Sequence, residues 1–153
     1  MKDALSTSVV LALLVFTFAA CSSAPTQTLD EVESKAVDLI GPRWELISFQ
    51  SAEGKNMTLP ANELYTLRFE TNKELSGRAA DCDPYFASYE ARDDGAISVG
   101  GVSSSLILCG VESSIPAYFE AIGNVGQYEL AGDDLRLGFG GQGVLTYRKG
   151  SLE

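Results

Sequence analysis

Cysteine thiols and paired carboxylates are the side chains in this 153-residue sequence whose types could carry chemistry. The thiols are Cys21, Cys82 and Cys109, and the carboxylates cluster at Asp81-Cys82-Asp83, Asp93-Asp94 and Asp133-Asp134. A thiol can be acylated or oxidised to a disulfide, and paired carboxylates can bind calcium or act as acid and base. The sequence contains no histidine, so neither a Ser-His-Asp nor a Cys-His catalytic site can be assembled.

The acidic clusters favour turns over a metal or catalytic site. Asp93-Asp94-Gly95 and Gly132-Asp133-Asp134 lie between stretches that are typical of strands, and Asp and Gly are common turn residues. No stretch has the alternating oxygen ligands of an EF-hand, and cysteines without histidine supply too few ligands for zinc. We therefore expect no metal, no cofactor, no catalytic residue and no enzymatic activity.

Residues 1–20 have the pattern of a secretory signal peptide. Lys2 gives a positive start, and the run from Val9 to Ala20 is apolar except for Thr17. This run is shorter than the about 20 apolar residues that a membrane-spanning helix needs. The small pair Ala19-Ala20 at its end suits cleavage.

The sequence "FAAC" (Phe18 to Cys21) resembles the lipobox of bacterial lipoproteins, although Leu is usual where Phe18 stands. In that class the cysteine becomes the first residue and carries two or three acyl chains, which anchor a protein stably. The resemblance implies a membrane-anchored protein that is lipidated at Cys21. Ser22 in place of Asp favours the outer membrane over the inner one, with the protein facing the periplasm.

Residues 21–38 are interpreted as the lipidated cysteine, a tether and a short helix. The stretch "SSAPTQT" has no apolar periodicity and contains Pro25. Thr28 and Glu31 match a capping box, which predicts a helix over roughly 29–38.

If Cys21 is lipidated, two cysteines remain in an oxidising compartment. An even number of cysteines there favours a disulfide, so we expect Cys82 to pair with Cys109. Two buried free thiols remain an alternative.

Residues 39–149 predict a small antiparallel β domain. Short stretches with period-two alternation are separated by turn residues, as in "RWELISF" (43–49) and "LYTLRFE" (64–70). Further strands are expected over 73–79, 85–91, 96–100 and 104–110, and a meander of three strands is expected over 126–149. One helix over 112–123 precedes these last three strands. We expect a barrel or a strongly coiled sheet, with Tyr85, Phe86 and Tyr89 in its core rather than around a ligand cavity.

Several segments together resemble the META domain of HslJ-like proteins. They are "GPRWEL", "YTLRFE", "LSGRAADCDPYFASYE", "GAISVG", "SSSLILCG" and "YELAGDDLRLGF". Gly77, Cys82, Tyr85, Tyr89 and Cys109 match the family pattern at appropriate spacing, whereas Asp83 and Ser105 stand where Asn and Thr are usual. The resemblance implies a mainly β, barrel-like META/HslJ fold with one helix before the last three strands.

The resemblance also implies a non-enzymatic envelope lipoprotein that acts in stress tolerance or protein–protein interaction. With 21 acidic and 11 basic residues, the formal net charge of -10 argues against nucleic-acid binding. It would favour a cationic protein partner, although a solvated acidic surface is the more common reason for such a charge. Two alternatives are an inhibitor of a basic enzyme, such as a lysozyme or a protease, and a lipocalin-like carrier. The carrier would require an open apolar cavity.

Overall fold

The computed structural model describes residues 36–80, 83–105 and 114–151. These residues form one nine-stranded sheet, one α-helix and one short 3-10 helix. The elements are η1 (Val37–Leu39), β1 (Arg43–Gln50), β2 (Asn56–Met57), β3 (Thr66–Phe69), β4 (Glu74–Ala79), β5 (Asp83–Ala91), β6 (Ile97–Ser104), α1 (Ile115–Gly123), β7 (Val125–Ala131), β8 (Asp134–Phe139) and β9 (Gly143–Lys149). In this part of the chain, no helix is long and apolar enough to span a membrane.

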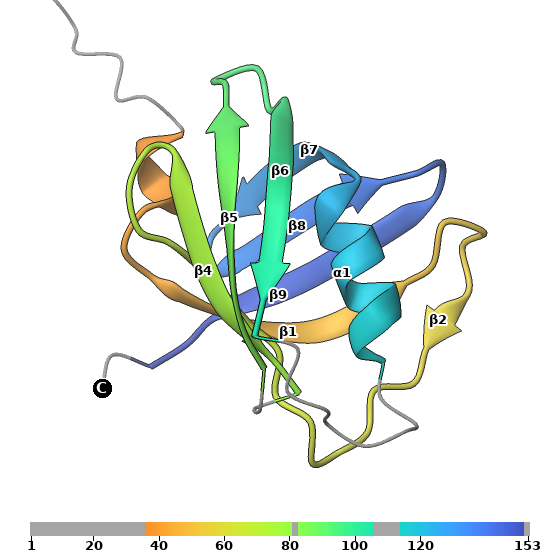
Figure 1. Ribbon diagram of the computed structural model, residues 1–153. Coiled ribbons are helices and arrows are strands. Elements are labelled where there is room, and N and C mark those ends of the chain that lie inside the picture. Colours follow the sequence, from red (N-terminus) through yellow and green to blue (C-terminus); the bar gives the residue numbers. More distant parts are fainter. Residues whose placement is uncertain (1–35, 81–82, 106–113, 152–153) are drawn as a thin grey trace, which may run out of the picture. The chain divides into compact units, whose positions relative to one another are not determined.

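The strands pair antiparallel in the order β6-β5-β4-β3-β1-β9-β8-β7, and the short strand β2 pairs with the end of β1. Most neighbours in the sheet are also neighbours in sequence. The exceptions are β1, which lies between β3 and β9, and the crossover through α1, which leads from β6 at one edge to β7 at the other (Figure 1).

The sheet curls until its two edges meet at one end. Ala96, just before β6, forms an antiparallel bridge with Gln127 of β7, and the Tyr128 N–H donates to the Gly95 carbonyl at 2.7 Å. Helix α1 packs against β6 along the part of the gap that has no such bridge (Figure 1). The predicted fold class is therefore confirmed as a mainly β, curled antiparallel sheet with one helix before the last three strands.

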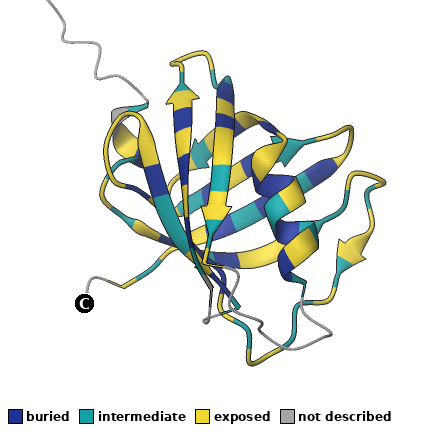
Figure 2. Ribbon diagram, viewed as in Figure 1, coloured by how far each residue is buried: buried dark blue, intermediate teal, exposed yellow. Residues whose placement is uncertain are grey.

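Alternation of apolar and polar residues explains which face of each strand is buried (Figure 2). In β9, Leu145 and Tyr147 are fully buried while Arg148 is exposed. In β1 the alternation changes phase, because the register with β9 shifts between Leu46 and Ser48. This bulge lets both Leu46 and Phe49 face the core and leaves Ile47 between them 48% exposed.

The strand predicted over 96–100 extends further along the chain than predicted, since β6 runs over Ile97–Ser104. The strand predicted over 104–110 lies almost wholly outside the described residues and stays a prediction. Gly101 adopts a positive φ of 64°, and the register with β5 shifts between Phe86 and Ser88. The strand therefore continues through Gly100 and Gly101 by forming a β-bulge. Residues 106–110 lie outside the described part of the chain.

The helix predicted over 29–38 lies largely outside the described residues. Val37–Leu39 form a 3-10 turn, which ends before Gly41 (φ 102°) and Pro42. The helix predicted over 112–123 is confirmed as α1 from Ile115, with Pro116 in its first turn and Tyr118 and Ile122 fully buried.

Gly77 in β4 allows the closest packing in the sheet. A Cβ atom added there would lie 2.1 Å from the Thr66 carbonyl oxygen and 2.5 Å from the ring and hydroxyl of Tyr85. Both neighbours are fixed, because Thr66 belongs to the adjacent strand and Tyr85 is fully buried. Only glycine therefore fits beneath the Tyr85 ring.

We expect Gly77→Ala to lower the free energy of unfolding by about 2–3 kcal/mol, because overpacking a fixed core forces backbone shifts. Gly126→Ala is the matched control, since Gly126 also lies in a strand but has no atom within 4 Å of its added Cβ. Its effect should stay within about 0.5 kcal/mol. Urea unfolding of both variants measures the difference, and equal midpoints would contradict the packing argument.

Candidate functional site

The cysteines singled out from the sequence lie outside the described residues. Lipidation of Cys21 and pairing of Cys82 with Cys109 therefore stay predictions. Pro84 follows Cys82 closely and Ser105 precedes Cys109, and the Ser105 N–H donates to the Pro84 carbonyl at 3.4 Å. Pro84 and Ser105 are therefore neighbours where β5 begins and just after β6 ends.

The acidic clusters at 93–95 and 132–134 serve the turns of the sheet. The Asp94 carboxylate accepts a hydrogen bond from the Ala96 N–H at 3.0 Å and lies 3.6 Å from the Arg92 guanidinium. Asp134 pairs with Arg148 across β8 and β9 at 3.0 Å. Among the described residues, no group of three or more His, Cys, Asp or Glu side chains could hold a metal ion.

Three buried tyrosines connect the helix to both halves of the sheet. Tyr85 comes from β5, Tyr118 from α1 and Tyr147 from β9, and all three side chains are fully buried. The Tyr85 hydroxyl donates to the Thr66 carbonyl at 2.9 Å and lies 2.9 Å from the Tyr118 hydroxyl. The Tyr147 hydroxyl in turn donates to Tyr118 at 3.0 Å.

The direction of this hydrogen-bond chain is fixed by its end at the Thr66 carbonyl. A phenol has one proton, and Tyr85 gives its proton to Thr66, so Tyr118 must donate to Tyr85 and can accept from Tyr147. Every hydroxyl in the chain is thereby satisfied without water. In the described part of the protein, no buried side-chain nitrogen or oxygen lacks a partner.

Burial raises the pKa of Tyr85, Tyr118 and Tyr147 well above the ordinary value of about 10. Desolvation is the largest cause for each of the three, because a phenolate would lose its hydration in the core. The three hydroxyls therefore remain neutral near neutral pH. The tyrosine chain supplies hydrogen bonds to the core and no acid or base for catalysis.

Aromatic contacts fix α1 over the same region. The Tyr118 ring packs against Tyr65 with centroids 4.8 Å apart and against Tyr85 at 5.9 Å, and Phe119 packs edge-on against Tyr85 at 5.4 Å. Contacts of this geometry add about 0.5–1.5 kcal/mol each beyond the buried area. The helix face that carries these rings fills the interior of the curled sheet.

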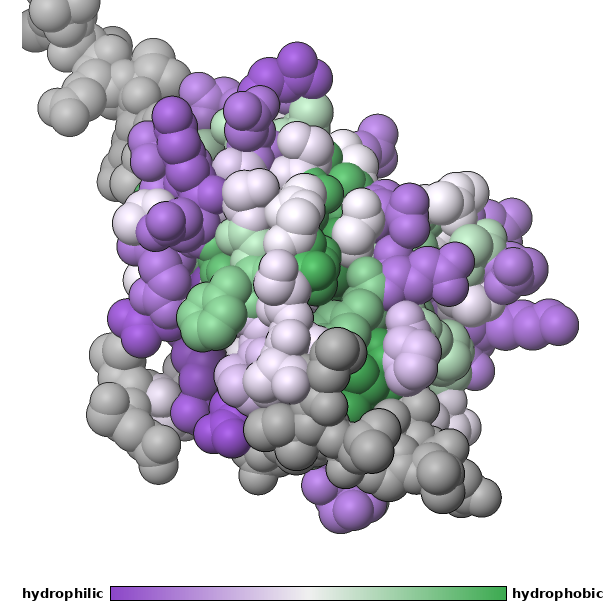
Figure 3. Space-filling model, viewed as in Figure 1, coloured by the Kyte–Doolittle hydropathy of each residue, from purple (hydrophilic) through white to green (hydrophobic). Residues whose placement is uncertain are grey.

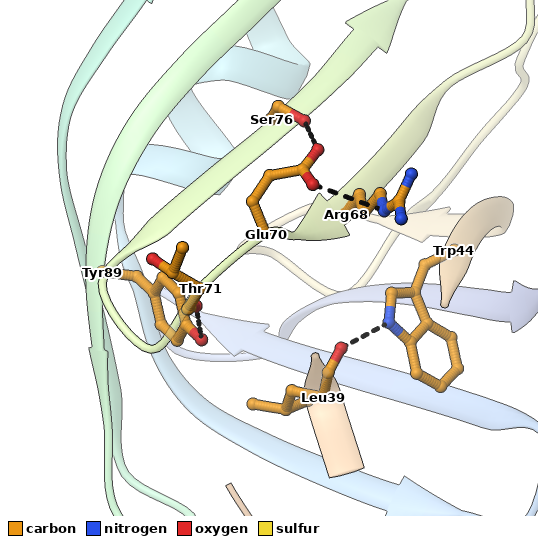
Figure 4. A network of polar contacts seen from close by, with 7 residues as sticks. All are labelled: Leu39, Trp44, Arg68, Glu70, Thr71, Ser76 and Tyr89. Carbon is orange, nitrogen blue, oxygen red and sulfur yellow. Dashed lines mark hydrogen bonds and ion pairs between the residues drawn. The ribbon is translucent and has the colours of Figure 1, made fainter. Parts of the chain in front are cut away.

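Polar contacts also stabilise the ends of the strands (Figure 4). The Trp44 indole N–H donates to the Leu39 carbonyl at 3.3 Å, which connects η1 to β1. The Tyr89 hydroxyl donates to the Thr71 carbonyl at 2.6 Å and so holds the turn between β3 and β4 against β5. On the outer face, Glu70 accepts a hydrogen bond from Ser76 and lies 3.5 Å from Arg68.

Phe86 departs from its predicted place in the core. Tyr85 and Tyr89 are buried as predicted, but Phe86 lies on the opposite face of β5 and is 63% exposed. It borders an outer hollow of about 610 Å³ that is otherwise lined mainly by small side chains and by Glu70 and Glu74. Figure 3 shows surface of near-neutral hydropathy over β5 and β6, with hydrophilic surface on the β4 side and hydrophobic surface toward α1.

Alternation in "YFASYEA" could have indicated that Phe86 faces outward, because Tyr85, Ala87 and Tyr89 share the other face of a strand. The prediction instead placed all three aromatic side chains in the core. Phe86 is therefore a candidate contact residue that period-two reasoning would have found.

The raised tyrosine pKa values predict the behaviour of the protein in alkali. All six tyrosines have pKa values above the ordinary one, so above about pH 10 the folded state binds more protons than the unfolded state. This part of the stability is fully present below about pH 10 and is lost as the pH rises further. We expect tyrosinate absorbance to appear together with the loss of the circular dichroism of the fold.

The control is the same chain in concentrated urea, whose tyrosines should ionise gradually near about pH 10. If most tyrosines of the folded protein ionised near that pH while its circular dichroism stayed unchanged, the burial of the tyrosine hydroxyls would be contradicted.

The described sheet resembles solved structures of low sequence identity. A protein from Burkholderia xenovorans, determined by NMR, has a TM-score of 0.63 at 21% identity, with 76% of this chain and 87% of that chain covered. A DUF4847 family protein from Bacteroides vulgatus has a TM-score of 0.55 at 10% identity, with 75% and 96% covered. At such identities the likeness extends to the fold alone. A comparison with curated proteins gives no match.

The family assignment comes from the sequence. The pattern of the META domain matches residues 37–151, from η1 through β9, and so includes the helix and every described strand. The chain therefore belongs to the META domain family.

Proposed function

We propose that this META domain is a non-enzymatic binding module that works through its outer surface and is held at the cell envelope by lipid on Cys21. The observation that carries the proposal is the filled interior, where Tyr85, Tyr118 and Tyr147 satisfy one another's hydroxyls. A carrier of the lipocalin type would need that space to be open. Contact with other molecules therefore falls to the exterior.

Features of the sequence support the location. Residues 1–20 match a signal peptide, and Cys21 stands where a lipobox cysteine stands. Two or three acyl chains give stable anchoring, whereas one gives only marginal binding. Ser22 after the cysteine favours the outer membrane, so the domain would face the periplasm on a short tether.

A cationic protein is the partner that the surface favours. Phe86 is 63% exposed beside a hollow of about 610 Å³, and exposed aromatic side chains are frequent anchors of protein interfaces. The net charge of -10 would draw a basic protein toward the domain over distances of about the Debye length. Such an interaction would act in envelope stress tolerance, and inhibition of a basic enzyme would be one form of it.

The anchor is tested by Cys21→Ser in the producing cell. We expect the variant to leave the membrane fraction, because removal of the thiol removes the site of acylation. Cys82→Ser is the control, and it should remain with the membrane. Continued membrane retention of Cys21→Ser, with signal-peptide processing unchanged, would refute the lipoprotein assignment.

The contact surface is tested by a photo-crosslinking amino acid placed at Phe86 or at Ile47, which is 48% exposed on β1. We expect position 86 to capture one discrete basic protein, with less capture as salt rises, and position 47 to capture none. Phe86→Ser should then weaken the isolated complex at least about tenfold, as for an interface anchor. Equal capture from both positions would refute the Phe86 surface as the contact.

A further inference from the structure

A second hollow lies on the outer surface beside the helix, between α1 and the turns that follow β1 and β8. It encloses about 390 Å³, and we call it the α1 groove. Phe49, Met57, Ala121 and Phe139 supply its apolar lining, and Glu53 and Glu120 supply its charge. The two turns are joined by a hydrogen bond from the Gln142 N–H to the Ala52 carbonyl at 3.0 Å, so the walls of the groove are built before any ligand enters.

The aromatic part of the groove is held in place by its neighbours. The Phe49 and Phe139 rings meet edge to face with centroids 6.1 Å apart. Gly143 lies directly under the Phe139 ring, since a Cβ added there would come within 2.6 Å of two ring atoms. Phe139 therefore keeps one fixed orientation while its side chain stays partly exposed.

Glu53 and Glu120 are the charged side chains of the lining, which includes no Lys or Arg. Both side chains are exposed, and in the described part of the chain neither forms an ion pair within 4 Å. The Ser51 hydroxyl donates to the Glu53 carboxylate at 2.8 Å, and this bond lowers the pKa of Glu53, with a smaller contribution from the charge of Lys55. Glu53 is therefore ionised at neutral pH.

Other outer hollows differ in their charge balance. In the hollow beside Phe86, Arg68 and Ser76 already bind Glu70, which leaves Glu74 as the one carboxylate of that lining without an ion pair among the described residues. A hollow that contains Glu90 also contains Lys73, and one that contains Glu129 also contains Arg136. The α1 groove combines an apolar floor with carboxylates that no cation in the lining neutralises.

We propose that the α1 groove binds a small amphipathic cation, a protonated amine or guanidinium carried on an apolar body. The apolar body would pack on Phe139 and Met57, and the cation would lie between Glu53 and Glu120, near the Phe139 ring. Cations are attracted both by carboxylates and by aromatic faces. The volume of the groove falls in the range of small-molecule pockets, about 300–1,000 Å³. This proposal depends neither on the anchor at Cys21 nor on the protein contact at Phe86.

Three probes of nearly equal shape test the proposal on the full chain in a non-ionic detergent. They are phenethylammonium, phenethyl alcohol and phenylacetate, which carry a positive charge, no charge and a negative charge. We expect saturable NMR shifts of the Ala117 and Ala121 methyl groups with phenethylammonium, at least about fivefold tighter binding than for the alcohol, and no saturation with phenylacetate. Equal binding of all three, binding of none, or shifts confined to the Phe86 hollow would overturn the proposal.

Charge-removing variants locate the cation. Glu53→Gln and Glu120→Gln should each weaken phenethylammonium binding about two- to fivefold and leave phenethyl alcohol unaffected. Glu90→Gln, an equal change of charge on an exposed residue of β5, is the matched control and should change neither. Unchanged circular dichroism shows that the variants at these three positions are folded. A double Glu53→Gln, Glu120→Gln variant that keeps its preference for the cation would overturn the assignment.

Discussion

The close packing of Tyr85 between Gly77 and Tyr118 is the interaction on which the rest of the domain depends. A phenol ring can reach the interior of the sheet here only because the facing strand has no side chain. Once buried, its hydroxyl needs partners, because an unpaired polar group in the core costs about 1–3 kcal/mol. Those partners come from β3, from α1 and, through Tyr118, from β9. One glycine thus determines where the helix and two distant strands must lie.

The described interior of the sheet is therefore filled by side chains, and its tyrosine hydroxyls are neutral and already hydrogen-bonded. The tyrosine hydroxyls are neutral and hydrogen-bonded to one another, and the aromatic rings around them fill the curl of the sheet. The binding functions proposed above therefore fall to the exterior, where two surfaces differ in their chemistry. The Phe86 surface offers an exposed ring beside Glu70 and Glu74, which we propose as a protein contact, whereas the α1 groove offers a concave apolar floor beside two carboxylates, which we propose binds a small cation.

Local patterns in the sequence were sufficient for much of the fold. Period-two alternation located most strands, and Pro116 and Gly123 bracketed the helix. Neighbouring Asp and Gly residues indicated the turns at 93–95 and 132–133. Features that depend on distant residues were missed. The bulge at Gly101 depends on the register with β5, and the hydroxyl chain joins residues from four elements. The α1 groove combines Phe49, Glu120 and Phe139, which only the folded sheet brings together.

The position of β1 in the sheet has a consequence for the order of folding. β1 is the first long strand to be synthesised, and one of its two neighbours, β9, is the last. Until β9 is synthesised, β1 is an exposed edge, and β7 and β8 meet the strands on the other side of β1 only through α1 and through the bridge between Ala96 and Gln127. Pairing of strands so far apart in sequence is slow, because the entropy cost of closing a long loop comes before the stabilising contacts between the strands can form. The sheet therefore stays incomplete until β9 has been synthesised, however early the strands on the other side of β1 are made.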